Sequence, residues 1–164
     1  MHDHSANGSK ASLLAVDLGV RTGLALFDGG GKLLWYRSTN FGSAARLKAG
    51  IPGLLRSISG LSVVVLEGGG DLGRIWTRET GKLGIRTFTI NAEEWRREML
   101  YERHRRTGAD AKARALRVSR NVIRWSGAPR PTSLRHDAAE AILIGFWGVV
   151  KLGWVDRLPL DIRE

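Results

Sequence analysis

The chain has 164 residues, of which 43% are hydrophobic, and this fits a single domain with room for a hydrophobic core. It contains no cysteine, which excludes a disulfide framework and a thiolate metal site. Its formal net charge is +10, which favours a polyanionic partner such as nucleic acid over a neutral or acidic one.

The N-terminal ten residues, MHDHSANGSK, lack the apolar segment of a secretory signal. We expect a disordered lead over 1–10 and a single domain over 11–164. The late apolar run AILIGFWGVV is too short to span a bilayer and predicts a buried helix. With no cysteine present, these features favour a cytoplasmic protein that is not secreted.

Three strands are predicted near the start of the domain, over 11–18, 22–28 and 32–39. The short turns between them imply antiparallel pairing. A helix is predicted over 43–58, and Pro52 is expected to break or kink it. The continuous apolar run LSVVVLE, residues 61–67, is typical of a strand that is covered on both faces.

The second half of the chain reads mainly as helices. The predicted elements are a helix over 72–84, a strand over 85–90, a helix over 91–106 capped by Asn91, a basic helix over 109–125, and a last helix over 133–150 capped by Ser133. This order predicts an α/β fold: one mixed five-stranded sheet, with three antiparallel strands and then parallel ones, and helices on both faces.

Acidic residues stand at special places in this pattern. Asp17 follows the apolar run LLAV, and Glu67 follows VVVL. If these two strands are parallel and adjacent, both carboxylates lie at one edge of the sheet. Asp137 and Glu140 are three residues apart at the start of the last helix, so they share one helix face.

Four converging carboxylates would repel one another and raise each other's pKa, and a divalent cation relieves that repulsion. Oxygen ligands select Mg²⁺ or Mn²⁺ over Zn²⁺. Two such ions would clamp a phosphoryl displacement, one activating water and the other stabilising the leaving oxygen. A basic protein with an acidic pocket therefore indicates a nuclease.

Plainer interpretations exist for each acid. Asp17 could mark a turn, Glu67 could be a solvated strand end, and the acids at 137 and 140 could be ordinary first-turn residues. Their common register with one sheet edge favours the metal site. His136, beside Asp137, is a candidate supporting residue or proton shuttle.

Three segments resemble motifs of the RuvC-type Holliday junction resolvases, within the RNase H-like superfamily: VDLGVRTGLALF at 16–27, VVVLE at 63–67 and RHDAAEAILIG at 135–145. The resemblance implies an RNase H-like fold and a metal-binding and catalytic tetrad of Asp17, Glu67, Asp137 and Glu140. It also implies a homodimer that uses Mg²⁺, for which Mn²⁺ would substitute, to resolve four-way DNA junctions in recombination and repair, as a nucleoid-associated protein.

The chain departs from the family pattern at two places. Its last acid is Glu140, where the family usually has Asp. The loop after the second acid reads GGGDLGRIW in place of the family's aromatic-bearing loop, and Trp76 is a candidate substitute for that aromatic side chain. If Trp76 does not take that role, it is predicted to be a core residue, and the same is predicted for Trp95 and Trp125.

Basic residues cluster between the last strand and the last helix. They either form a solvated, salt-bridged face or grip phosphates. GADAKARAL, at 108–116, resembles the family's basic segment. The candidate DNA contacts are Arg21, Arg74, Arg103, Arg105, Arg106, Lys112 and Arg114.

Other interpretations remain. GGGDLG, at 68–73, fits the glycine pattern of a dinucleotide-binding turn, but an acid precedes it and three antiparallel strands come first. D-L-G-x-x-T-G resembles the phosphate loop of sugar kinases and actin-like ATPases, which need two lobes. A RuvX-like nuclease acting on RNA and a non-catalytic nucleic-acid-binding module on the same fold stay open as alternatives.

Overall fold

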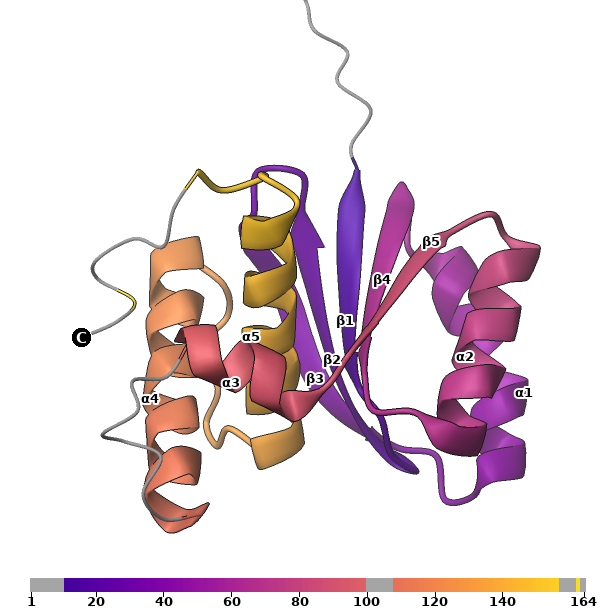
Figure 1. Cartoon of the computed structure of the whole chain (residues 1–164), viewed down its shortest axis with the longest axis horizontal. Coiled ribbons are helices and arrows are strands. Elements are labelled where there is room, and N and C mark those ends of the chain that lie inside the picture. The colour runs from indigo at the N-terminus through magenta and orange to yellow at the C-terminus, as the bar shows by residue number, and fades with distance from the viewer. Residues whose placement is uncertain (1–10, 100–107, 157–161, 163–164) are drawn as a thin grey trace, which may run out of the picture.

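The computed structural model describes residues 11–99, 108–156 and 162. Within these residues, five strands form one sheet in the order β3-β2-β1-β4-β5 (Figure 1). The strands and helices are β1 (Ser12–Asp17), β2 (Arg21–Asp28), β3 (Leu33–Asn40), α1 (Ala44–Ser57), β4 (Leu61–Glu67), α2 (Gly70–Lys82), β5 (Arg86–Ile90), α3 (Ala92–Met99), α4 (Gly108–Ser126) and α5 (His136–Lys151).

The strand pairing is the mixed arrangement that the sequence predicts. β1 pairs with β2 and β2 with β3 in antiparallel fashion, whereas β1 with β4 and β4 with β5 are parallel. In the parallel pair at the centre, Asp17 is directly opposite Glu67. The carboxyl ends of these two strands therefore bring two acidic residues to the same sheet edge.

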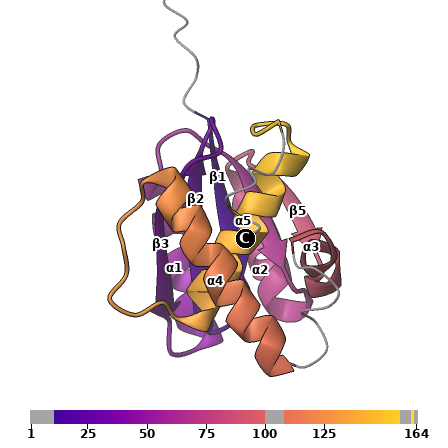
Figure 2. The same cartoon turned by 90° about the vertical axis from the view of Figure 1, so that its left-hand side faces the viewer.

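Helices cover both faces of the sheet, as expected (Figure 1). Leu14 and Val16 of β1 face the core shared with α1 and α2, while Leu13 and Ala15 face the core shared with α4 and α5. Figure 2 looks onto this second layer, with α4 in front of α5. Burial on both faces explains why β1 and β4, at the centre of the sheet, read as continuous apolar runs rather than alternating ones.

Pro52 does not break α1, since one helix runs from Ala44 to Ser57, and a kink at this residue stays a prediction. The buried side chains of α1, which include Ile51 and Leu54, pack both halves of the helix against the same core. Proline removes the donor to the carbonyl of Lys48, which is an exposed residue that solvent can reach.

Two helix starts can be compared with their predicted caps. Asn91 caps α3 as expected: its Oδ1 accepts from the Glu94 amide at 2.9 Å, and Glu94 Oε2 accepts from the Asn91 amide at 3.3 Å, which is a capping box. The prediction of a Ser133 cap on α5 is wrong, because the helix starts at His136. There the carboxylate of Asp137 accepts a hydrogen bond from the Ala138 amide at 2.9 Å, which gives this first-turn amide a partner.

The predicted lead over 1–10 lies outside the described residues. In the part that the structure describes, no helix combines the length and the apolar character needed to cross a membrane.

Candidate functional site

Three carboxylates from three different elements converge at one edge of the sheet. Asp17 ends β1, Glu67 ends β4, and Glu140 lies in the second turn of α5. One ligand oxygen from each lies within 4.8 Å of the others. Glu140 is 7% exposed and the other two are half-buried. This grouping brings together three of the four acids that the sequence singles out.

Glycines allow α5 to approach the sheet closely enough to place Glu140. Gly23 of β2 is the register partner of Asp17, and a Cβ at Gly23 would lie 2.0 Å from the carbonyl oxygen of Asp137. Further along the helix, a Cβ at Gly145 would lie 2.2 Å from the ring of Phe27. Contacts this short exclude any side chain, so the backbone of α5 packs directly against β2.

Asp137 lies outside the group of three. Its Oδ2 accepts a hydrogen bond from the Ser38 hydroxyl at 2.5 Å, and its Oδ1 accepts from the Ala138 amide. Asp137 is still close enough for its charge to raise the pKa of Asp17. The structure therefore shows three converging carboxylates, with a fourth held at their margin by β3.

Trp95 links the core to the site. The side chain of this α3 residue is fully buried, and its Nε1 donates to Glu67 Oε2 at 2.9 Å. Of the three tryptophans predicted to be core residues, Trp76 and Trp95 are fully buried, which confirms the prediction for them, and Trp125 is partly buried against the core. A substitute role for Trp76 in the glycine loop is wrong, because its ring packs in the core under α1 and α2.

Two basic side chains hold one oxygen of Glu140. The Arg96 Nη2 lies 2.7 Å from Glu140 Oε1, and the His136 Nε2 lies 3.1 Å from the same atom. His136 thus supports a site carboxylate, and its role as a proton shuttle stays a prediction. Arg96 belongs to the predicted basic stretch, but nothing in the sequence pairs it with Glu140, 44 residues away.

Burial and mutual repulsion make this group unfavourable as three free anions. They raise the pKa of Asp17 from 3.8 to about 8, mainly through burial and then through Glu140, Glu67 and Asp137, with Arg96 opposing them. Burial also raises the pKa of Glu67, against the hydrogen bond from Trp95. An oxygen-only donor set of this kind, short of positive charge, fits a hard divalent cation such as Mg²⁺ or Mn²⁺.

The predicted DNA contacts fall into three groups. Arg21, Arg74 and Lys112 are exposed. Arg114 is 5% exposed, so in this conformation its side chain is part of the interior and not of a basic surface. Arg103, Arg105 and Arg106 lie outside the described residues.

The glycine loop after Glu67 borders an open groove. Its volume is about 620 Å³, and its lining includes Gly68, Gly69 and Gly70 with Arg74 and Arg78 of α2. Gly68 and Gly70 have positive φ values of 112° and 67°, a backbone conformation that favours glycine in this loop. Arg74 pairs with Asp71 within the same helix.

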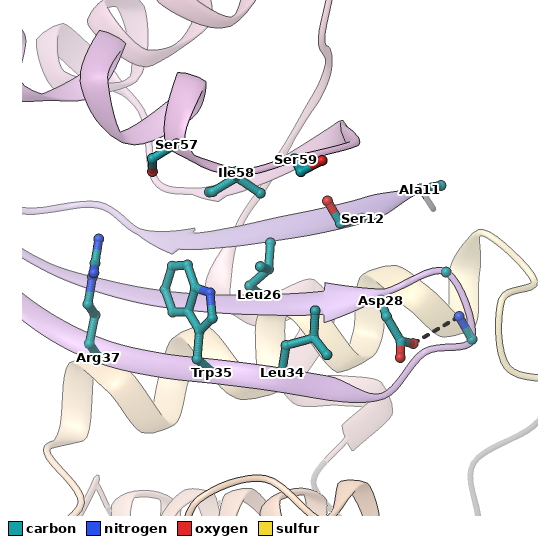
Figure 3. A pocket seen from close by; sticks show the side chains of 12 residues that line it. Ala11, Ser12, Leu26, Asp28, Leu34, Trp35, Arg37, Ser57, Ile58 and Ser59 are labelled. Carbon is teal, nitrogen blue, oxygen red and sulfur yellow. Dashed lines mark hydrogen bonds between the residues drawn. The ribbon is translucent and has the colours of Figure 1, made fainter. Parts of the chain in front are cut away.

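A larger cavity, of about 880 Å³, lies at the opposite end of β1 and is lined by Ser12, Trp35, Arg37 and Ile58 (Figure 3). Asp28, which also lines it, is engaged in the β2–β3 turn, where its Oδ1 accepts from the amides of Gly30 and Lys32 at 2.9 Å. This cavity contains none of the converging carboxylates, so its size does not mark the chemical site.

Comparison with known proteins tests the fold. No family model and no curated protein matches the chain. Among solved structures, the yeast mitochondrial Holliday junction resolvase matches with a TM-score of 0.50 and 11% identity, over 92% of this chain and 86% of that one. The catalytic core of BIV integrase matches with a TM-score of 0.34 and 13% identity, over 93% and 88%. The first similarity shows that the chain shares the overall fold of that protein, and it confirms the fold class that the sequence predicts.

Proposed function

We propose that this protein is a divalent-metal-dependent endonuclease that resolves four-way DNA junctions. The observation that carries the proposal is the convergence of Asp17, Glu67 and Glu140 at one sheet edge, with the pKa of Asp17 raised to about 8. A site that disfavours its own negative charge is built for a cation. The resolvase-type fold and the net charge of +10 support a nucleic-acid substrate.

Asp17, Glu67 and Glu140 would hold the metal, and Asp137 would be the fourth acidic residue of the centre. Two Mg²⁺ ions bound there, or Mn²⁺ in their place, would supply an activated water and stabilise the leaving oxygen. Trp95 keeps Glu67 oriented through its Nε1 hydrogen bond. Hydrogen bonds from residues that are not themselves metal ligands fix the orientation of ligating carboxylates in this way.

The basic residues around the site would bind the DNA backbone. Arg21 follows Asp17 by four residues and Arg74 follows Glu67 by seven, and both are exposed. Their guanidinium groups suit phosphate recognition. His136 would take up or deliver a proton at Nε2, which already lies 3.1 Å from Glu140.

Paired nicks in a two-fold symmetric junction require two active sites related by the same symmetry. A homodimer with a two-fold axis supplies them. We therefore propose that the working form is a homodimer on branched DNA, acting on the cytoplasmic nucleoid in recombination and repair.

The direct test is cleavage of a synthetic four-way DNA junction with Mg²⁺ or Mn²⁺, using the wild-type protein and Asp17→Asn. Linear duplex and an RNA–DNA hybrid are the control substrates. We expect paired symmetric nicks in the junction that disappear in the variant. Cleavage of the hybrid alone would move the function to RNA processing. Junction binding with no metal-dependent cleavage of any substrate would leave a binding module.

A further inference from the structure

The positively charged side chain of Arg96 lies at the edge of the three converging carboxylates. Arg96 extends from α3 so that its Nη2 lies 2.7 Å from Glu140 Oε1. Its guanidinium carbon lies 5.0 Å from the ring centroid of Trp95, whose Nε1 donates to Glu67. Arg96 therefore touches one site carboxylate directly and lies against the indole that donates to a second.

The bonding at Glu140 leaves little room for another cation on the same atom. Oε1 faces both Arg96 Nη2 and His136 Nε2, and a carboxylate oxygen has two lone pairs. The charge of Arg96 also lowers the pKa of both Asp17 and Glu67, against the effect of burial. In this arrangement the arginine partly supplies the positive charge that the group needs.

We propose that Arg96 is the built-in counter-ion of the site and that it competes with divalent cations for Glu140. The proposal rests on the proposed function, because it assumes that Glu140 is a metal ligand. Arg96 stabilises the metal-free protein, and a metal ion that is ligated by Oε1 would have to displace the Arg96 contact at that atom. The side chain is 38% exposed, so it can swing outward, where a guanidinium is suited to a phosphate of the substrate.

The test is calorimetric titration of the full chain with MnCl₂, comparing wild type with Arg96→Met. Methionine keeps most of the side-chain length and removes the charge and the donors. We expect the variant to bind Mn²⁺ about tenfold more tightly, since the competing contact is gone, a difference of about 1.4 kcal/mol. The melting temperature of the metal-free variant should be lower than that of the wild type.

Arg97→Met is the matched control. Arg97 lies on the same helix, carries the same charge and pairs with the exposed Glu93 at 3.7 Å. Its removal should leave the Mn²⁺ affinity close to that of the wild type. If it tightens binding as much as Arg96→Met does, the effect is general electrostatics and the proposal is wrong.

Two further variants separate the possible failures. Arg96→Lys retains the charge and should bind Mn²⁺ with intermediate affinity, which keeps the test available if the methionine variant folds poorly. Asp17→Asn should abolish binding. Unchanged or weaker affinity in both Arg96 variants, with binding still lost in Asp17→Asn, would overturn the role of Arg96 alone. No binding by the wild type would overturn the proposed metal site itself.

Discussion

At the scale of single residues, the site is a place where folding and function conflict. An uncharged residue at position 17 would cost the folded protein less free energy than Asp17 does, because burial and three neighbouring carboxylates oppose the ionisation of Asp17. The fold tolerates this cost because the cores on both faces of the sheet fix the strand that carries it. Strained electrostatics of this kind are typical of functional sites.

The first prediction concerns the stability of the metal-free protein. Folded Asp17 holds its proton up to about pH 8, whereas an unfolded chain releases it near the ordinary pKa of 3.8. Between these values the folded state binds more protons, so the free energy of unfolding falls as pH rises. Asp17→Asn removes this dependence. At pH 8 without metal, the melting temperature of this variant should exceed that of the wild type. The difference should be about 2–4 °C for each kcal/mol that the substitution adds to the free energy of unfolding.

Thermal unfolding at pH 5 and pH 8 in the presence of a chelator measures this difference. The gain should be smaller at pH 5, and added Mn²⁺ should stabilise the wild type but not the variant. A variant that is less stable than the wild type at pH 8 would contradict the account of Asp17.

The second prediction concerns Trp95. Trp95→Phe removes the Nε1 hydrogen bond to Glu67 while keeping an aromatic ring in the core. Because that bond lowers the pKa of Glu67, its loss should raise this pKa further and weaken Mn²⁺ binding by about tenfold or more. Calorimetry on the folded variant measures the change.

Trp76→Phe is the control for the lost volume. Trp76 is equally buried, and within the described residues its Nε1 has no hydrogen-bond partner. It should lose stability from the smaller ring but keep its metal affinity. Equal weakening of metal binding in the two variants would mean that packing, and not the bond to Glu67, is responsible.

At the scale of elements, the position of α5 decides whether the site forms. The helix lies against β2 so closely that Gly23 has no room for a Cβ, which would come within 2.0 Å of the Asp137 carbonyl. The third prediction is that Gly23→Ala displaces the start of α5, costs about 1–3 kcal/mol of stability and weakens Mn²⁺ binding.

Gly53→Ala is the matched control for the third prediction. Gly53 lies in α1, and a Cβ there would meet no atom within 4 Å. Alanine in a helix interior should stabilise the protein by about 0.5–1 kcal/mol and leave metal binding unchanged. Calorimetry and denaturant unfolding measure both variants. Unchanged Mn²⁺ affinity in Gly23→Ala would contradict the role given to this helix contact.

The elements themselves were largely predictable, because strong local patterns coincide with the tertiary structure. LSVVVLE predicts β4 with its observed bounds, and the Asn91 capping box marks the start of α3. The start of α5 and the continuity of α1 through Pro52 were not predictable. Each depends on packing: α5 on its approach to β2, and α1 on the core that holds both halves of the helix.

The acids of the site could be named from sequence, because each stands at the end of an apolar run or at a helix start. The contacts that other side chains make with these acids could not be predicted from the sequence. Ser38, Trp95 and Arg96 reach the acids across 99, 28 and 44 positions. No local pattern encodes such pairs, so the separation of Asp137 from the other three acids was also not foreseeable.

At the scale of the whole molecule, a chain with a net charge of +10 contains a group of three converging carboxylates. The fourth prediction is that binding of a four-way junction by the Asp17→Asn protein, which we expect to lack cleavage activity, depends steeply on salt. With about six phosphate contacts, the affinity should fall about 10³-fold between 50 and 200 mM salt. Fluorescence anisotropy across that range measures the slope.

Replacing both Arg21 and Arg74 with alanine in the Asp17→Asn background should reduce that slope by about 2, one for each lost phosphate contact. Arg56→Ala is the control, since Arg56 is exposed in the last turn of α1 and directly precedes Ser57, which lines the cavity at the far end of the sheet. A slope that responds equally to Arg56 would mean that the DNA is bound by diffuse charge and not beside the carboxylates.

We propose that Asp17, Glu67 and Glu140 form a divalent cation site. The most direct measurement is the anomalous diffraction of crystals grown with MnCl₂, for wild type and Asp17→Asn. We predict anomalous density between the three carboxylates in the wild type, with Arg96 moved off Glu140, and no density there in the variant. Manganese absent from this sheet edge, or bound in the same place without Asp17, would contradict the account.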